Sequence, residues 1–188
     1  MLKFLLPILL ISSLFTREYI AVIDFEGIGV SEGEARALTQ RLTSEIISLE
    51  MYQIVERSEM KRLLDEQKFQ YSGCVDITCA VDIGKLIGAK YMVVGSISKL
   101  GNAFSLDSRM ISVETGESYI SATYTVEGKI EKIIKYGMKS LAYQLCELEP
   151  PKISPITKLT DTLNNNRYII GGVSVLIWMA WGMNWIAL

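Results

Sequence analysis

Residues 91–126 read YMVVGSISKLGNAFSLDSRMISVETGESYISATYTV. In this stretch the residue pattern changes from the helical period, and three segments are predicted to be β-strands: 91–100, 103–113 and 118–126. Gly101-Asn102 is a two-residue hairpin signal between the first two segments, and residues 114–117 (ETGE) form the second turn. Strands joined by hairpins are antiparallel, so this stretch predicts three adjacent antiparallel strands.

The residues before this stretch alternate strands with helices. Tyr19–Phe25 (YIAVIDF) is an apolar run dense enough for a buried strand, and Tyr52–Val55 is a second short strand. A helix opens at Ser31, because Ser31 and Glu34 have the spacing of a capping box. Three- and four-residue steps give this helix one apolar face, made of Ala35, Leu38, Leu42, Ile46 and Leu49.

Three more helices complete the domain. Ser58 is positioned to cap the second helix. The third covers Ile77–Ile87 and ends at Gly88. Their inward residues are Met60, Leu63 and Leu64, then Ala80, Ile83 and Ile87, and in the closing helix Ile130, Ile133, Ile134, Met138, Leu141 and Leu145. The sequence therefore predicts an α/β (α+β) domain, a mixed β-sheet packed with helices in the order β-α-β-α-α-β-β-β-α.

The C-terminal end of the chain predicts a membrane anchor. Tyr168–Leu188 (YIIGGVSVLIWMAWGMNWIAL) contains no charged residue, and a helix needs about 20 apolar residues to cross a bilayer. Residues 150–167 hold three of the four prolines and no apolar periodicity, which is typical of a flexible linker. We therefore expect a domain at residues 18–149 tethered by a transmembrane helix at residues 168–188.

Residues 1–17 resemble a secretory signal. Lys3 precedes an apolar core at residues 4–15 that is too short to span a bilayer. We favour export of the domain, and an uncleaved interfacial segment is the alternative. A competing topology also stands, because basic residues flank the tail on its domain side: Lys152, Lys158 and Arg167. The positive-inside rule would then place the domain in the cytoplasm.

Composition disfavours several classes of function. The 19 basic and 21 acidic residues are interspersed, with no basic stripe for nucleic acid. The chain has no histidine, which removes the commonest general base and most zinc and iron sites. Asp24 and Glu26 share one face of a strand, but no nucleophile or base is evident beside them. We therefore expect no enzyme activity, no catalytic residues, no metal and no cofactor.

Cys74 and Cys79 form a C-x4-C pair beside the third predicted helix. In an exported protein, two nearby cysteines are most simply a disulfide. The alternative is two buried thiols in a reducing compartment. A metal site would need two more ligands, which the sequence does not offer. Cys146 lies beside Leu145 on the closing helix, which suggests a core thiol.

A glycine-rich segment follows the first predicted strand. Gly27, Gly29 and Gly33 are one residue off the spacing of a dinucleotide-binding loop, and Glu56 closes the next strand where such a loop would want an acid. The acidic residues crowded around the glycines would repel a pyrophosphate: Glu26, Glu32 and Glu34. Glycines that form turns are the simpler interpretation.

The core segments resemble a known family: AVIDFEGIGVSEGEARALTQRLTSEI (21–46), YQIVERSEMKRLLDEQKFQYSGC (52–74) and CAVDIGKLIGAKYMVVGSISKLGNAFSLDSRMISVETGE (79–117). This pattern is similar to the CsgG family of curli production assembly and secretion components, in its short periplasmic-domain members, and to LpoB-type domains. The resemblance implies a periplasmic, membrane-anchored envelope protein. It would bind partner proteins or itself, without catalysis. The alternative is a membrane-tethered sensor that binds a nucleotide or another ligand.

Overall fold

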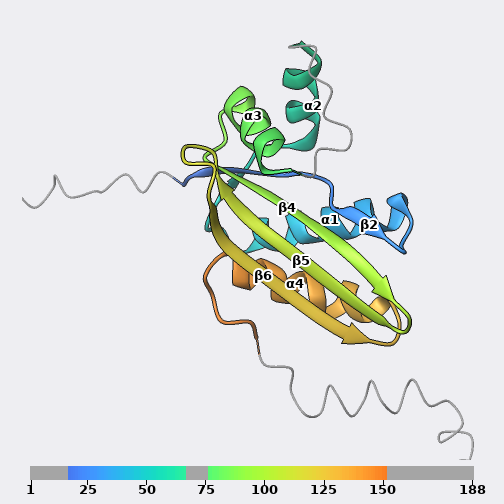
Figure 1. The fold of residues 1–188 in the computed structure, drawn as a ribbon. Coiled ribbons are helices and arrows are strands. Elements are labelled where there is room, and N and C mark those ends of the chain that lie inside the picture. Colours follow the sequence, from blue (N-terminus) through green and yellow to red (C-terminus); the bar gives the residue numbers. More distant parts are fainter. Residues whose placement is uncertain (1–16, 67–75, 152–188) are drawn as a thin grey trace, which may run out of the picture. The chain divides into compact units, whose positions relative to one another are not determined.

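The computed structural model describes residues 17–66 and 76–151 (Figure 1). The six strands are β1 (Tyr19–Val22), β2 (Glu26–Ile28), β3 (Gln53–Ile54), β4 (Tyr91–Leu100), β5 (Ala103–Ser112) and β6 (Ser118–Glu127). The helices are α1 (Glu32–Ser48), α2 (Arg57–Glu66), α3 (Ile77–Ile87) and α4 (Met138–Leu145), the last preceded by a π-helical turn, η2 (Ile133–Gly137).

The strands form one mixed sheet, as the sequence predicts. Its order is β3-β1-β4-β5-β6, and β2 also pairs with β4. The pairs β1–β3, β1–β4 and β2–β4 are parallel, whereas β4–β5 and β5–β6 are antiparallel. Leu100 faces Ala103 across the two-residue turn, whose Gly101 has a φ of 60°. The predicted hairpin is therefore confirmed.

The first strand is shorter than predicted, and the predicted order lacks one strand. β1 ends at Val22, and a separate strand, β2, follows a three-residue break. In the break the backbone N–H of Phe25 donates to the Thr39 hydroxyl oxygen at 3.0 Å, so it does not join the ladder. Pairing then resumes where Glu26 faces Ser96 on β4. A side chain of α1 thus accompanies the early end of β1, and β2 is a further strand beyond the predicted run.

The helix starts and ends follow local capping, with one correction. The capping box of α1 is confirmed, because the Ser31 hydroxyl accepts from the Glu34 N–H and Glu34 accepts from the Ser31 N–H. Gly88 ends α3 with a φ of 69°. Ser58 as the cap of α2 is wrong: the Met60 N–H already donates to the Glu56 carbonyl, so the helix begins at Arg57.

The closing helix begins with a π turn that the periodicity did not predict. Ile133 is fully buried, but Ile134 is 46% exposed, so its predicted inward place is wrong. The extra residue in the π turn shifts the following positions around the helix axis. Gly137 ends this turn against Leu106 and Tyr124, where a Cβ atom would lie within about 3 Å of both side chains.

Two hydrophobic clusters lie on opposite faces of the sheet. The larger cluster joins α1 and α4 to the sheet and holds most of the buried side chains. The smaller one joins α2 and α3 to the other face and includes Met60, Leu64 and Ile83. Leu63, predicted inward, is only half-buried. Cys146 is a buried free thiol, as predicted, and burial raises its pKa to about 11.

Several predictions concern parts of the chain that lie outside the described residues. They are residues 1–16 of the signal-like segment, Cys74, nearly all of the linker and the predicted transmembrane helix at residues 168–188. Among residues 17–66 and 76–151, no helix has both the length and the apolarity that crossing a membrane requires.

Candidate functional site

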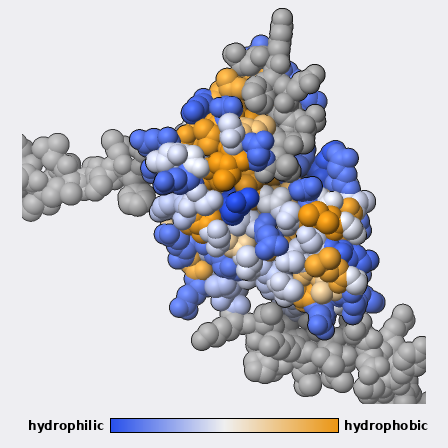
Figure 2. All heavy atoms as spheres, in the orientation of Figure 1, coloured by the Kyte–Doolittle hydropathy of each residue, from blue (hydrophilic) through white to orange (hydrophobic). Residues whose placement is uncertain are grey.

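The sheet has one face that the described helices only partly cover. α1 and α4 pack on one side of the long strands β4, β5 and β6, while α3 contacts β4 and β5 on the other side. Beyond α3, this second side carries short polar and charged side chains: Ser96, Ser98, Ser105, Asp107, Arg109, Ser121, Thr123 and Thr125. We call it the open face. Figure 2 has the orientation of Figure 1 and shows mainly polar residues where the long strands lie.

The open face is hollowed where β1, β2 and the long strands meet. The hollow has a volume of about 290 Å³. Its lining includes the carboxylates of Asp24, Glu26 and Asp107, the guanidinium of Arg109, and the hydroxyl groups of Ser96, Ser121 and Thr123. The Ser105 hydroxyl donates to the Asp107 carboxylate at 2.9 Å, which orients that acid. The hollow therefore offers donors and acceptors of both charge signs.

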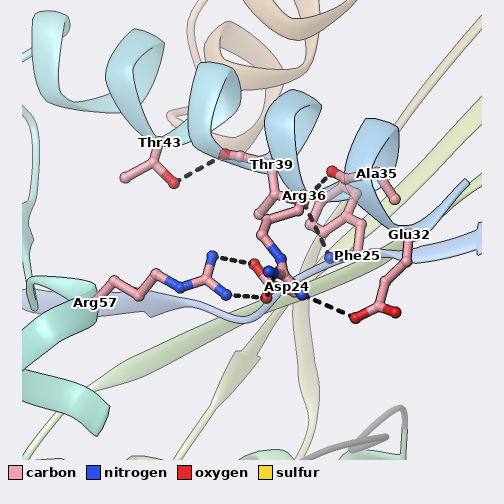
Figure 3. A network of polar contacts seen from close by, with 8 residues as sticks. All are labelled: Asp24, Phe25, Glu32, Ala35, Arg36, Thr39, Thr43 and Arg57. Carbon is pink, nitrogen blue, oxygen red and sulfur yellow. Dashed lines mark hydrogen bonds and ion pairs between the residues drawn. The ribbon is translucent and has the colours of Figure 1, made fainter. Parts of the chain in front are cut away.

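Asp24 joins the hollow to two helices (Figure 3). Both terminal nitrogens of Arg57, the first residue of α2, donate to the Asp24 carboxylate. Arg36 of α1 approaches the same carboxylate at 3.8 Å and donates to Glu32 at 2.8 Å. A two-pronged pair of this kind fixes geometry as well as charge. Asp24 thus connects the hollow to α1 and α2.

Gly95 shapes the centre of the sheet beside the hollow. A Cβ atom at this position would lie 2.4 Å from the Asp107 carbonyl oxygen and 2.8 Å from the ring of Phe25. Only glycine lets the ring and the neighbouring strand come this close. Phe25 in turn is fixed by its hydrogen bond to Thr39, whose hydroxyl donates to the Ala35 carbonyl at 2.8 Å.

These groups suit recognition of polar surfaces. Asp24 and Glu26, the pair considered from sequence, both line the hollow, but Asp24 is neutralised by arginines. Within residues 17–66 and 76–151 no cluster of three metal-ligating side chains occurs. Hydroxyl groups and charges of both signs on this strand surface can both donate and accept hydrogen bonds.

The glycine-rich segment is part of the fold. Gly27 lies in β2, Gly29 follows it with a φ of 73°, and Gly33 lies in the first turn of α1. Nearby, hydrogen bonds from Ser31 lower the pKa of the Glu34 carboxyl. Gly29 thus has the turn conformation of the simpler interpretation. A second hollow, of about 440 Å³, adjoins it and is lined in part by Lys99 and Lys129.

The two cysteines of the predicted disulfide are not both described. Cys79 lies in the first turn of α3, where its N–H donates to the side chain of Asp76, the helix cap, at 2.7 Å. Cys74 lies outside the described residues, so the pairing stays a prediction.

The open face has a signature in the sequence of β5. In β5 the buried Phe104, Leu106 and Met110 alternate with Ser105, Asp107 and Arg109. That alternation predicts one solvated face. The pairing of Arg57 with Asp24 could not be predicted from such a period, because the two residues lie 33 positions apart in sequence.

Comparisons with known proteins were made for sequence and for fold. The family model "Curli production assembly/transport component CsgG" matches residues 21–127. No curated protein matches the chain. The LpoB C-terminal domain from Salmonella enterica is similar in structure, with a TM-score of 0.51 and 19% identity over 62% of this chain and 87% of that one.

Two further solved structures have the same TM-score, 0.51. The LpoB C-terminal domain from Escherichia coli is 19% identical, covering 58% of this chain and 82% of its own. Lipoprotein GNA1162 from Neisseria meningitidis is 8% identical, covering 80% of this chain and 96% of its own. At these identities the structural likeness concerns the fold alone.

Proposed function

The chain belongs to the CsgG family of curli production assembly/transport components, and on that premise we propose that it is a non-catalytic cell-envelope protein that binds a protein partner across its open face. The observation that supports this most is the hollowed polar surface on β4, β5 and β6. A sheet face that the described helices leave open can bind a partner through its hydrogen-bond donors and acceptors without rearrangement of the core.

We place the domain outside the cytoplasmic membrane, with residues 168–188 as its anchor. The signal-like residues 1–17 and the family membership support export. A linker at residues 150–167 would let the open face reach partners away from the bilayer surface. No nucleic acid, metal or cofactor enters this proposal.

Position-specific crosslinking tests the partner. A photo-reactive residue at Ser105, on the open face, should give one discrete adduct in intact cells, whereas the same residue at Ser44, exposed on α1, should give none. Arg109→Glu should lower the Ser105 adduct at least tenfold, because it reverses a charge in the hollow. The yield of adduct is read by mass and immunoblot.

A matched charge reversal away from the hollow controls this experiment. Lys61→Glu makes the same change on the exposed side of α2 and should leave the adduct unchanged. Equal adduct yields at Ser105 and Ser44, or equal effects of the two charge reversals, would contradict docking on the open face.

The ligand-sensor alternative has less support. The hollow presents three carboxylates, which would repel phosphate groups, and the glycine-rich segment is used by β2 and a turn. A nucleotide panel in a thermal-shift assay should therefore leave the unfolding temperature unchanged. A specific nucleotide that raised it in proportion to its concentration would favour the sensor instead.

Export also predicts the state of the cysteines. Cys74 and Cys79 should be disulfide-bonded in intact cells, because the compartment outside the cytoplasmic membrane is oxidising. An alkylating reagent added without reductant should modify neither, and both should react after reduction and unfolding. Full labelling before reduction would place the domain in the cytoplasm and would overturn both the pairing and the export. Cys146→Ser removes the third thiol and simplifies the mass readout.

A further inference from the structure

β6 lies at the edge of the sheet, and no other strand among residues 17–66 and 76–151 pairs with its outer side. It is ten residues long and pairs only with β5 in the described sheet. Thr123 shows which residues point outward, because its N–H and C=O both bond to a side chain outside the ladder. The period of two places Ser121 and Thr125 in the same orientation.

Gln144 of α4 occupies the middle of this edge. Its side-chain oxygen accepts from the Thr123 N–H at 3.3 Å, and its side-chain nitrogen donates to the Thr123 carbonyl at 3.1 Å. One carboxamide thus imitates the peptide group that a neighbouring strand would present. The Ser140 hydroxyl accepts a further bond from the same nitrogen, at 3.2 Å. The edge is therefore already shaped to receive a strand.

The composition of β6 does not protect it. Natural proteins discourage edge pairing with charges, prolines or very short strands. Residues 118–126 (SYISATYTV) contain no charge and no proline, and they are rich in residues that favour strands. At the end of the strand, the Lys132 ammonium donates to the Glu127 carbonyl at 2.8 Å. Lys132 therefore occupies the end of the outer edge and Gln144 its middle, at Thr123.

We propose that β6 is a self-association edge, at which a second copy of this chain adds its own β6 antiparallel after Gln144 has moved aside. A two-fold axis at Thr123 would pair Thr123 with its own copy and Ser121 with Thr125 of the other chain. Each of these pairs exchanges two backbone hydrogen bonds. Side chains on the open-face side would then be hydroxyl against hydroxyl, a favourable cross-strand combination.

A second copy fits this edge for reasons of symmetry and charge. When a strand pairs with the same strand of a second copy, its charged residues can meet like charges across the two-fold axis. Residues 118–126 carry no charge, so no like charges meet in this register. Glu127, the only acid of the strand, would face Tyr119 of the other chain. In this register the Glu127 carbonyl, to which Lys132 donates, lies at the end of the paired segment.

This inference rests on the proposed function and deepens it, since both describe a domain that works by binding. It concerns the backbone edge of β6, whose residues Ser121, Thr123 and Thr125 also carry side chains on the open face, and it names the partner. Its test needs no other protein, so its failure leaves docking on the open face untouched. Conversely, loss of the Ser105 adduct would not affect self-association.

The first test removes the carboxamide. Gln144→Ala should tighten self-association of the full-length chain at least tenfold, because Thr123 loses its competing bonds and alanine suits the helix. Sedimentation equilibrium in a density-matched detergent measures the dissociation constant. An unchanged or weaker constant would overturn the role of Gln144.

The second test uses the register, in the Gln144→Ala background. Ser121→Pro deletes an outward N–H, which an edge strand tolerates, and should abolish association. The unfolding temperature of this variant should stay within a few degrees of that of its parent. Ser121→Lys with Thr125→Lys should also abolish it, because lysines then face lysines across the axis. Ser121→Lys with Thr125→Glu should restore it, since each lysine then faces a glutamate.

The outcomes divide cleanly. Loss with the two lysines and recovery with the lysine–glutamate pair support a symmetric β6–β6 contact centred on Thr123. Equal association of both charge variants, or of Ser121→Pro and its parent, would overturn that contact. A Gln144→Ala chain that stays monomeric but takes up a different protein at β6 would overturn the second copy as occupant.

Discussion

Gly95→Ala is expected to lower the free energy of unfolding by about 2–3 kcal/mol, toward the upper end of what overpacking a core costs. The added methyl would lie 2.4 Å from the Asp107 carbonyl oxygen, a backbone atom that no side-chain rotation can move. It would also lie 2.8 Å from the Phe25 ring. Urea unfolding of the full-length chain in detergent should show a lower midpoint with an unchanged slope.

A second glycine provides the control. Gly33 lies in the first turn of α1 with no atom within 4 Å of a built Cβ, so Gly33→Ala should raise stability by up to about 1 kcal/mol. The opposite signs separate steric overpacking from any general effect of replacing glycine. Phe25→Leu combined with Gly95→Ala should destabilise less than the sum of the two changes, because the ring is one of the two obstacles. Full additivity would remove Phe25 from the explanation, and a neutral Gly95→Ala would refute it.

The antiparallel half of the sheet could be predicted because its signals are local. The alternation of β4, β5 and β6 and the turn at Gly101-Asn102 lie within one stretch, and each was confirmed. The capping box at Ser31 is equally local. Such patterns depend on neighbours a few residues away, so no tertiary information is needed to interpret them.

The errors fall where a distant residue decides the local structure. Thr39 accepts the hydrogen bond of the Phe25 N–H, so β1 stops before Phe25 and β2 begins after it, which no period within the run reveals. The π turn before α4 accommodates Gly137 against Leu106 and Tyr124, and it moves Ile134 outward. In both places tertiary packing overrides a regular pattern.

The sequence predicts only part of the candidate surfaces. The polar residues of the open face follow the strand period, but the period cannot say which side the helices leave uncovered. Gln144 lies 21 residues from Thr123, and its distance from β6 depends on how α4 packs. Side chains that bond to a distant backbone therefore have to be found in the structure.

Deletion of residues 168–188 is expected to move the protein almost completely from the membrane pellet to the soluble fraction. The apolar residues of this segment each favour the bilayer centre, by about 0.3–0.6 kcal/mol for leucine, isoleucine and valine, and no charge opposes them. The remaining domain folds around its own core, so the truncated chain should keep the urea midpoint of the full-length protein. Fractionation followed by alkaline extraction measures the distribution.

Two companion deletions assign the anchor to this segment. Removing residues 157–167 is also a deletion, but it shortens the linker and leaves the apolar tail in place. This chain should therefore stay in the pellet and resist alkaline extraction. Removing residues 1–17 tests the other apolar end. If the chain without residues 168–188 remained in the pellet and the additional loss of residues 1–17 released it, the N-terminal segment would be the anchor. The tail would then need another explanation, such as burial against a partner, because three tryptophans in an uncharged run are costly to leave in water.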